Sequence, residues 1–103
     1  MERIEKLKEY LQTNNNDSFL QHALALEYIK IGKDEEAKKL FSEIIAREPT
    51  YVGTYYHLAK LQERIGNTEE AIKIYEQGMQ QAKKAGDNHA YNELQGAYED
   101  LVY

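Results

Sequence analysis

The sequence predicts an all-α fold, a stacked helical solenoid of about six antiparallel helices. An internal repeat is the first observation behind this prediction, since Leu24 and Phe41 return 34 residues later as Leu58 and the aromatic Tyr75. Each repeat contains two stretches with apolar residues at helical spacing, and a repeat of this length with two helices is typical of solenoids. The connections between the stretches are short, so neighbouring helices are expected to run antiparallel.

Residues that begin and end helices set the boundaries of the predicted elements. Asp17 or Ser18 can cap the second helix, and Gly32 supplies the left-handed residue that ends it. Asp34 is expected to cap the third helix, and Pro49 marks its end. The six predicted helices cover residues 3–12, 18–31, 34–48, 51–65, 68–84 and 88–102.

Three of the six glycines fall inside predicted helices instead of turns. Gly78 lies where two helices would approach closely, which is a packing reason for a small residue. Gly53 lies in the first turn of the fourth helix, and Gly96 in mid-helix costs up to about 1 kcal/mol relative to alanine.

Composition narrows the class of protein. The 103 residues suffice for one small domain, and the net charge of −5 with interspersed charges argues against a nucleic-acid binder, which would need a basic stripe. The chain has no cysteine, so disulfides and thiolate chemistry are excluded. No stretch reaches the roughly 20 apolar residues of a membrane span, and the charged N-terminus does not look like a secretion signal, so we expect a cytoplasmic protein without a membrane partner. The sequence is compatible with a complete small protein and with an excised domain.

The repeat positions resemble those of the tetratricopeptide repeat family. The first full repeat matches the family signature through Gln21, Leu24, Ala25, Tyr28, Ala37, Phe41 and Pro49, and the second through Tyr55, Leu58, Ala59, Gln62, Ala71 and Tyr75. Gln21 and Gln62 depart from it at usually aromatic sites. The resemblance implies an α-α superhelix with a concave face, as a single domain over residues 1–103. Its predicted parts are a half repeat at 1–17, repeats at 18–51 and 52–87, and a half repeat at 88–103.

The resemblance also implies where a partner would bind. In the family the first helix of each pair lines the concave groove, and these helices carry apolar, aromatic and basic residues here. The predicted partner-binding residues are Phe19, His22, Leu26, Ile29, Tyr56, His57, Lys60, Arg64, His89 and Asn92. Such a groove suits a short peptide with an apolar side chain and an acid.

Two more specialised functions of the groove have less support in the sequence. The family's basic clamp for chaperone carboxylates needs lysine and asparagine at positions that hold His22, Leu26 and His57, so it is not present in recognisable form. The three histidines lie on successive groove helices, which leaves a pH-sensitive groove open. No pair at i and i+4 exists to bind a metal, and we expect neither a metal nor another cofactor.

No catalytic motif emerges from the chain. The paired acids Glu35-Glu36 and Glu69-Glu70 follow helix starts, where negative charge offsets the helix macrodipole. We therefore predict a non-enzymatic module that binds a peptide or protein partner in its groove. The alternative is a self-associating scaffold protein that dimerises through its terminal helices, since the last helix ends with the apolar Leu101, Val102 and Tyr103.

Overall fold

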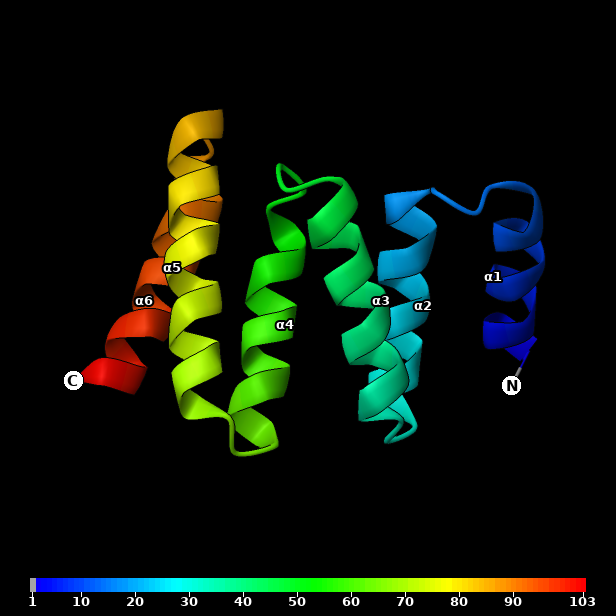
Figure 1. Ribbon diagram of the computed structural model, residues 1–103, viewed down its shortest axis with the longest axis horizontal. Coiled ribbons are helices and arrows are strands. Elements are labelled where there is room, and N and C mark those ends of the chain that lie inside the picture. Colours follow the sequence, from blue (N-terminus) through cyan, green and yellow to red (C-terminus); the bar gives the residue numbers. More distant parts are fainter. Residues whose placement is uncertain (1) are drawn as a thin grey trace. The chain divides into compact units, whose positions relative to one another are not determined.

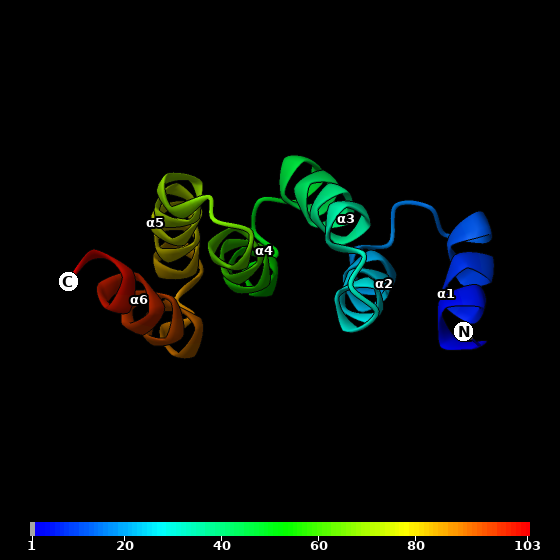
Figure 2. The ribbon, with the colours of Figure 1, turned by 90° about the horizontal axis from the view of Figure 1, so that it is seen from below.

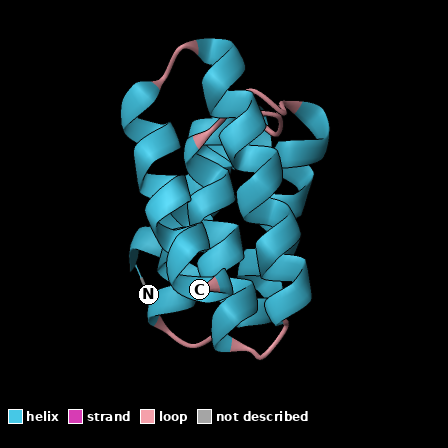
Figure 3. Ribbon diagram, turned by 90° about the vertical axis from the view of Figure 1, so that its left-hand side faces the viewer, coloured by secondary structure: helices cyan, strands magenta, loops and turns pink. Residues whose placement is uncertain are grey.

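The computed structural model describes residues 2–103, and this part of the chain consists of helices joined by loops, without strands (Figures 1 and 3). Its helices are α1 (Glu2–Thr13), α2 (Ser18–Lys30), α3 (Asp34–Arg47), α4 (Gly53–Arg64), α5 (Thr68–Ala85) and α6 (Asn88–Val102). The predicted fold class, an all-α helical repeat fold, is confirmed. Each predicted boundary lies within two residues of the observed one, the largest difference being the later start of α4 at Gly53.

The chain divides into two compact units. The first ends at Glu48 and contains α1, α2 and α3, and the second begins at Pro49 and contains α4, α5 and α6. Within each unit, consecutive helices pack against one another. In Figure 2, which looks nearly along the helix axes, α2 lies beside α3, and α5 lies between α4 and α6.

The first unit has an apolar core along α2. Ile4 and Leu7 of α1 are buried with Leu24 of α2 in one cluster. On α3, Phe41 is fully buried, and the small Ala25 of α2 is as well. Small and large side chains thus alternate as the repeat signature requires, because a small residue allows two helix axes to approach closely.

The second unit repeats this arrangement with larger side chains. Tyr55 on α4 and Tyr75 on α5 are the largest of its buried residues, and Leu94 closes the core from α6. The buried hydroxyl of Tyr55 donates a hydrogen bond to the Pro49 carbonyl oxygen at 2.7 Å, so the loop before α4 is tied to the core.

Helix ends follow the predicted signals with one exception. Asp17 caps α2, because its carboxylate accepts a hydrogen bond from the Leu20 amide at 3.0 Å. Gly32 adopts φ +78°, in the left-handed region that favours glycine. The prediction for Asp34 is wrong: Asp34 is the first residue of α3, and the N-cap position is held by Lys33, which makes no side-chain capping bond.

The two glutamines at usually aromatic positions are buried and hydrogen-bonded. Gln21 accepts a hydrogen bond from Arg47 at 2.6 Å and donates one to the Asn15 carbonyl oxygen at 3.3 Å. Gln62 accepts one from Asn67 at 2.9 Å. Each glutamine therefore joins its helix to a neighbouring loop or helix by polar contacts, so the departure from the signature changes the local packing and preserves the hairpin.

Candidate partner-binding surface

The face of α2 is the part of the predicted surface that lies in the first unit. Phe19 is 70% exposed, and no other phenylalanine in the chain is comparably accessible, since Phe41 is buried. Leu26 and Ile29 are half-buried on the same helix. The His22 ring packs against the Phe41 ring with centroids 5.4 Å apart, so His22 contacts the core of its own unit as well as its surface.

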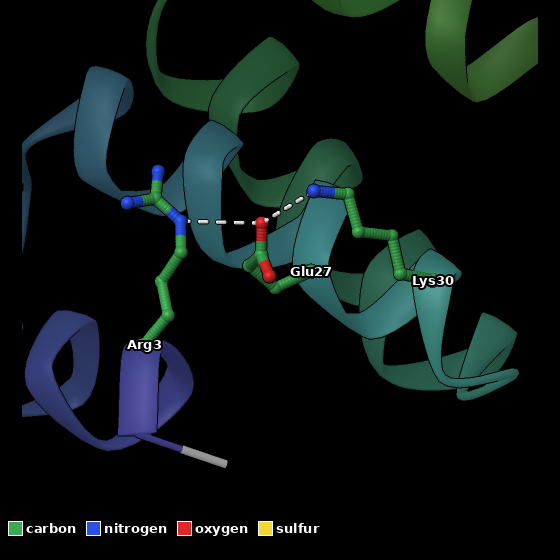
Figure 4. A network of polar contacts seen from close by, with 3 residues as sticks. All are labelled: Arg3, Glu27 and Lys30. Atoms are coloured by element: carbon green, nitrogen blue, oxygen red, sulfur yellow. Dashed lines mark hydrogen bonds and ion pairs between the residues drawn. The ribbon is translucent and has the colours of Figure 1, made fainter.

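A charged network borders this face. Glu27 of α2 accepts hydrogen bonds from Lys30, at 3.1 Å, and from Arg3 of α1, at 3.2 Å (Figure 4). The hydrogen bond from Lys30 and, after it, the neighbouring Arg3 hold the pKa of the Glu27 carboxyl below its usual value. The sequence analysis missed Glu27, and its only sequence signal is the i, i+3 spacing to Lys30.

The face of α4 contributes a compact aromatic and basic cluster in the second unit. The rings of Tyr56 and His57 meet edge to face with centroids 5.6 Å apart. The Lys60 ammonium lies 5.7 Å from the centroid of the Tyr56 ring and 3.7 Å from a Glu63 carboxylate oxygen. The contact with the ring is a cation–π interaction, which keeps the cation beside an apolar surface. Of these three predicted residues, Tyr56 therefore contacts both His57 and Lys60.

Glu63 connects this cluster to the core. The Tyr75 hydroxyl of α5 donates a hydrogen bond to its carboxylate. Burial, followed by this carboxylate neighbour, raises the pKa of Tyr75, so the tyrosine remains the donor. Tyr75 is the counterpart of Phe41 in the preceding repeat, and its extra hydroxyl needed a partner. The same Glu63 oxygen, Oε2, therefore contacts both the Lys60 ammonium and the hydroxyl of the core residue Tyr75.

The remaining predicted residues are more exposed. Arg64 is the last residue of α4, and His89 and Asn92 lie in the first part of α6. Helices α4 and α6 contact each other, and Glu93 of α6 interacts electrostatically with His57. The structure thus places the ten predicted residues in two groups, one on α2 and one on α4 and α6.

We expect His57 to make the stability of the protein sensitive to pH. Burial lowers its pKa below the usual 6.5, and the negative charge of Glu93 opposes this shift only in part. Between the two pKa values the unfolded chain binds a proton that the folded chain does not, so the free energy of unfolding is expected to fall as pH drops through 6.5. Urea denaturation at pH 7.5 and about pH 5.5 should show a smaller loss in His57→Gln than in the parent chain.

His89→Gln is the matched control for this experiment, because His89 is exposed. It should lose as much stability on acidification as the parent chain. An equal loss in His57→Gln and the parent chain would contradict the assignment to His57.

Residues 2–103 contain neither a metal-binding cluster nor a membrane-spanning helix. Among residues 2–103, no group of three or more histidine, aspartate or glutamate side chains is placed to hold a metal ion. No helix within the same residues combines the length and apolar character needed to cross a membrane.

Comparison with known proteins identifies the repeats. A family model described as tetratricopeptide repeat matches residues 32–98. The solution structure of a tetratricopeptide repeat domain protein from Salinibacter ruber is 42% identical, covers 84% of this chain and 87% of that one, and superimposes with a TM-score of 0.81. The first TPR of Spaghetti (RPAP3), bound to an HSP90 peptide, is 20% identical over 97% of this chain and 78% of that one, with a TM-score of 0.75, which shows a shared fold.

Two relatives known by sequence differ in how much of their own length this chain spans. A TPR repeat-containing protein of Pseudomonas aeruginosa is 26% identical over 91 residues, which are 88% of this chain and 87% of that protein. The chain spans only 18% of the mouse interferon-induced protein with tetratricopeptide repeats 3, which is 22% identical over 71 residues. Since the family model covers more than half of the chain and includes residues of both units, the chain belongs to the tetratricopeptide repeat family.

Proposed function

We propose that the chain is a non-enzymatic interaction module that binds a peptide, or a short segment of a protein partner, along the first helices of its repeats. These helices are α2, α4 and α6. Tetratricopeptide repeats are protein–protein interaction modules, and one structural neighbour is bound to an HSP90 peptide. Both facts support a peptide-binding role. The chemistry of the ligand is inferred from the residues of this chain.

The observation that carries the proposal is the cluster on α4. Lys60 lies over the Tyr56 ring and beside Glu63 before any ligand is present, so it loses little side-chain entropy on binding. A cation beside an aromatic surface recognises a carboxylate that has an apolar neighbour. The Tyr56 ring beside this cation supplies the apolar contact area. The ligand class is therefore a peptide that combines an acidic residue with apolar side chains.

Selection from a random peptide library tests this proposal. The parent protein should enrich peptides with an acidic residue next to apolar ones. The double variant Lys60→Glu, Arg64→Glu should bind the selected peptides at least about tenfold more weakly, because each reversal replaces attraction by repulsion. Isothermal titration calorimetry measures both affinities.

The control carries the same change of charge on α5, in Lys73→Glu, Lys84→Glu, where both side chains are exposed. It should keep the parent affinity. Thermal unfolding of both variants establishes that each is folded. Unchanged binding by a folded Lys60→Glu, Arg64→Glu protein would overturn the proposal.

A further inference from the structure

Three positions that are apolar in the first full repeat carry polar side chains in the second. The replacements, 34 residues apart, are Leu26 to Lys60, Ile29 to Glu63 and Phe41 to Tyr75. Two of these positions lie on the first helix of the repeat, α2 or α4, and the third lies on the second helix, α3 or α5. In the second repeat Glu63 contacts both other residues, so the three changes form one connected set.

This set of contacts runs from the core of the second unit to its surface. Tyr75 is fully buried, whereas the Glu63 side chain is 27% exposed and the Lys60 side chain is 43% exposed. The Tyr75 hydroxyl donates a hydrogen bond to Glu63 Oε2, and the same oxygen lies 3.7 Å from the Lys60 ammonium. A core residue that cannot touch a ligand therefore contacts a residue beside the candidate partner-binding cluster.

The Tyr75 hydroxyl is a fixed donor. Its ring belongs to the close-packed core, where side chains keep one arrangement. Burial, and after it the neighbouring Glu63, raises the pKa of Tyr75, so the hydroxyl keeps its proton. A partly exposed glutamate ordinarily samples several rotamers, and this hydrogen bond restricts Glu63 to one of them.

The position of Glu63 determines how strongly it occupies Lys60. Their separation of 3.7 Å is longer than the roughly 2.7–3.2 Å of an N–H···O hydrogen bond. The carboxylate therefore attracts the ammonium without a direct hydrogen bond between the two side chains. A Glu63 released from Tyr75 could approach Lys60 closely and compete with the carboxylate of a ligand. By anchoring Glu63, the Tyr75 hydroxyl prevents this closer approach.

We infer that Tyr75 is a positioning residue of the proposed peptide-binding surface: its hydroxyl, acting through Glu63, sets the preference of Lys60 for an acidic ligand over the neutral amide. This role rests on the proposed peptide binding. The ligand class that it favours is a peptide with a free side-chain or terminal carboxylate at the α4 cluster. The matching positions of the first repeat, Leu26 and Ile29, carry no charge, so the preference belongs to the second repeat.

Tyr75→Phe tests this role, and the first measurement needs no ligand. The variant should fold, because Phe41 occupies the corresponding buried position of the first repeat. Carbon-13 NMR relaxation of the Glu63 side-chain methylene groups should show lower order in Tyr75→Phe than in the parent protein, because the anchor of the carboxylate is gone. Unchanged order at Glu63 would overturn the inference.

The second measurement compares two probes by isothermal titration calorimetry. One is an acidic peptide selected by the parent protein, and the other is the same peptide with its acid replaced by the amide. The ratio of the two affinities should fall at least about threefold in Tyr75→Phe, mainly through weaker binding of the acidic peptide. In a Lys60→Met background the same substitution should leave the ratio unchanged, because Tyr75 acts through Glu63 on Lys60.

Tyr55→Phe is the matched control. It removes another buried tyrosine hydroxyl of the second unit, one that donates to the Pro49 carbonyl oxygen, and should change neither the Glu63 order nor the affinity ratio. An unchanged ratio in Tyr75→Phe, or an equal fall in Tyr55→Phe, would overturn the inference and leave the proposed function intact. A parent protein that binds acidic and amide peptides equally would overturn both.

Discussion

Replacing Phe41 with alanine is expected to lower the free energy of unfolding by about 3–5 kcal/mol. Phe41 is fully buried on α3, and its ring packs against His22 of α2. Truncation leaves a cavity at the joint of the first hairpin, and the surrounding helices can fill it only in part. Because small domains have a total stability of about 5–15 kcal/mol, this single change removes a large fraction of the free energy that keeps the protein folded.

The other phenylalanine of the chain supplies the matched control. Phe19→Ala removes the same atoms from a side chain that is 70% exposed, so it should change the stability by no more than about 0.5 kcal/mol. Urea denaturation followed by circular dichroism measures both variants. Equal losses of stability in Phe41→Ala and Phe19→Ala would contradict the packing described for the first unit.

Replacing Gly78 with alanine is expected to destabilise the second unit, although alanine is the better helix former. A Cβ atom at this position would lie 2.7 Å from Tyr55 Cβ and 3.1 Å from Leu94 Cδ1. The Cβ atom of Tyr55 is fixed to the backbone of α4, so no side-chain rotation relieves the overlap, and α4 and α5 must move apart. Overpacking of this kind costs about 1–3 kcal/mol or more, which exceeds the gain of up to about 1 kcal/mol in helix propensity.

Gly96→Ala is the control, because a Cβ atom there meets nothing within 4 Å. It lies inside α6 and should raise the stability by about 0.5–1 kcal/mol. The two substitutions are chemically identical, so thermal unfolding should show opposite shifts of the midpoint. A higher midpoint for Gly78→Ala would refute the close approach of α4 and α5.

The helices were predictable because their signals are local. Apolar periodicity placed all six, and Gly32, Gly66 and Gly86 adopt positive φ at helix ends, where glycine is favoured. Gly78 was also interpreted correctly, since a Cβ atom there would overlap Tyr55 of α4. Asp34 was assigned wrongly as a cap, because aspartate suits both the capping position and the first helical turn.

The candidate surface was predictable only in part. The position of a helix within the repeat predicts which helix of each pair carries the candidate residues. It does not predict which side chains those residues contact. Nothing local in the sequence shows that Tyr75 donates to Glu63, or that Arg47 reaches the buried Gln21 from a position 26 residues away. Such contacts join different helices, and their partners follow from the packing geometry of the hairpin.

The sequence by itself determined the family, the helices and the pairing of helices into hairpins, because a repeated pattern of large and small apolar residues is compatible with few other structures. The tertiary structure decided which polar residues are held in place and which side chains from different helices contact one another. These features depend on distances between segments far apart in the chain. The periodicity of one helix contains no information about the side chains that another helix brings to it.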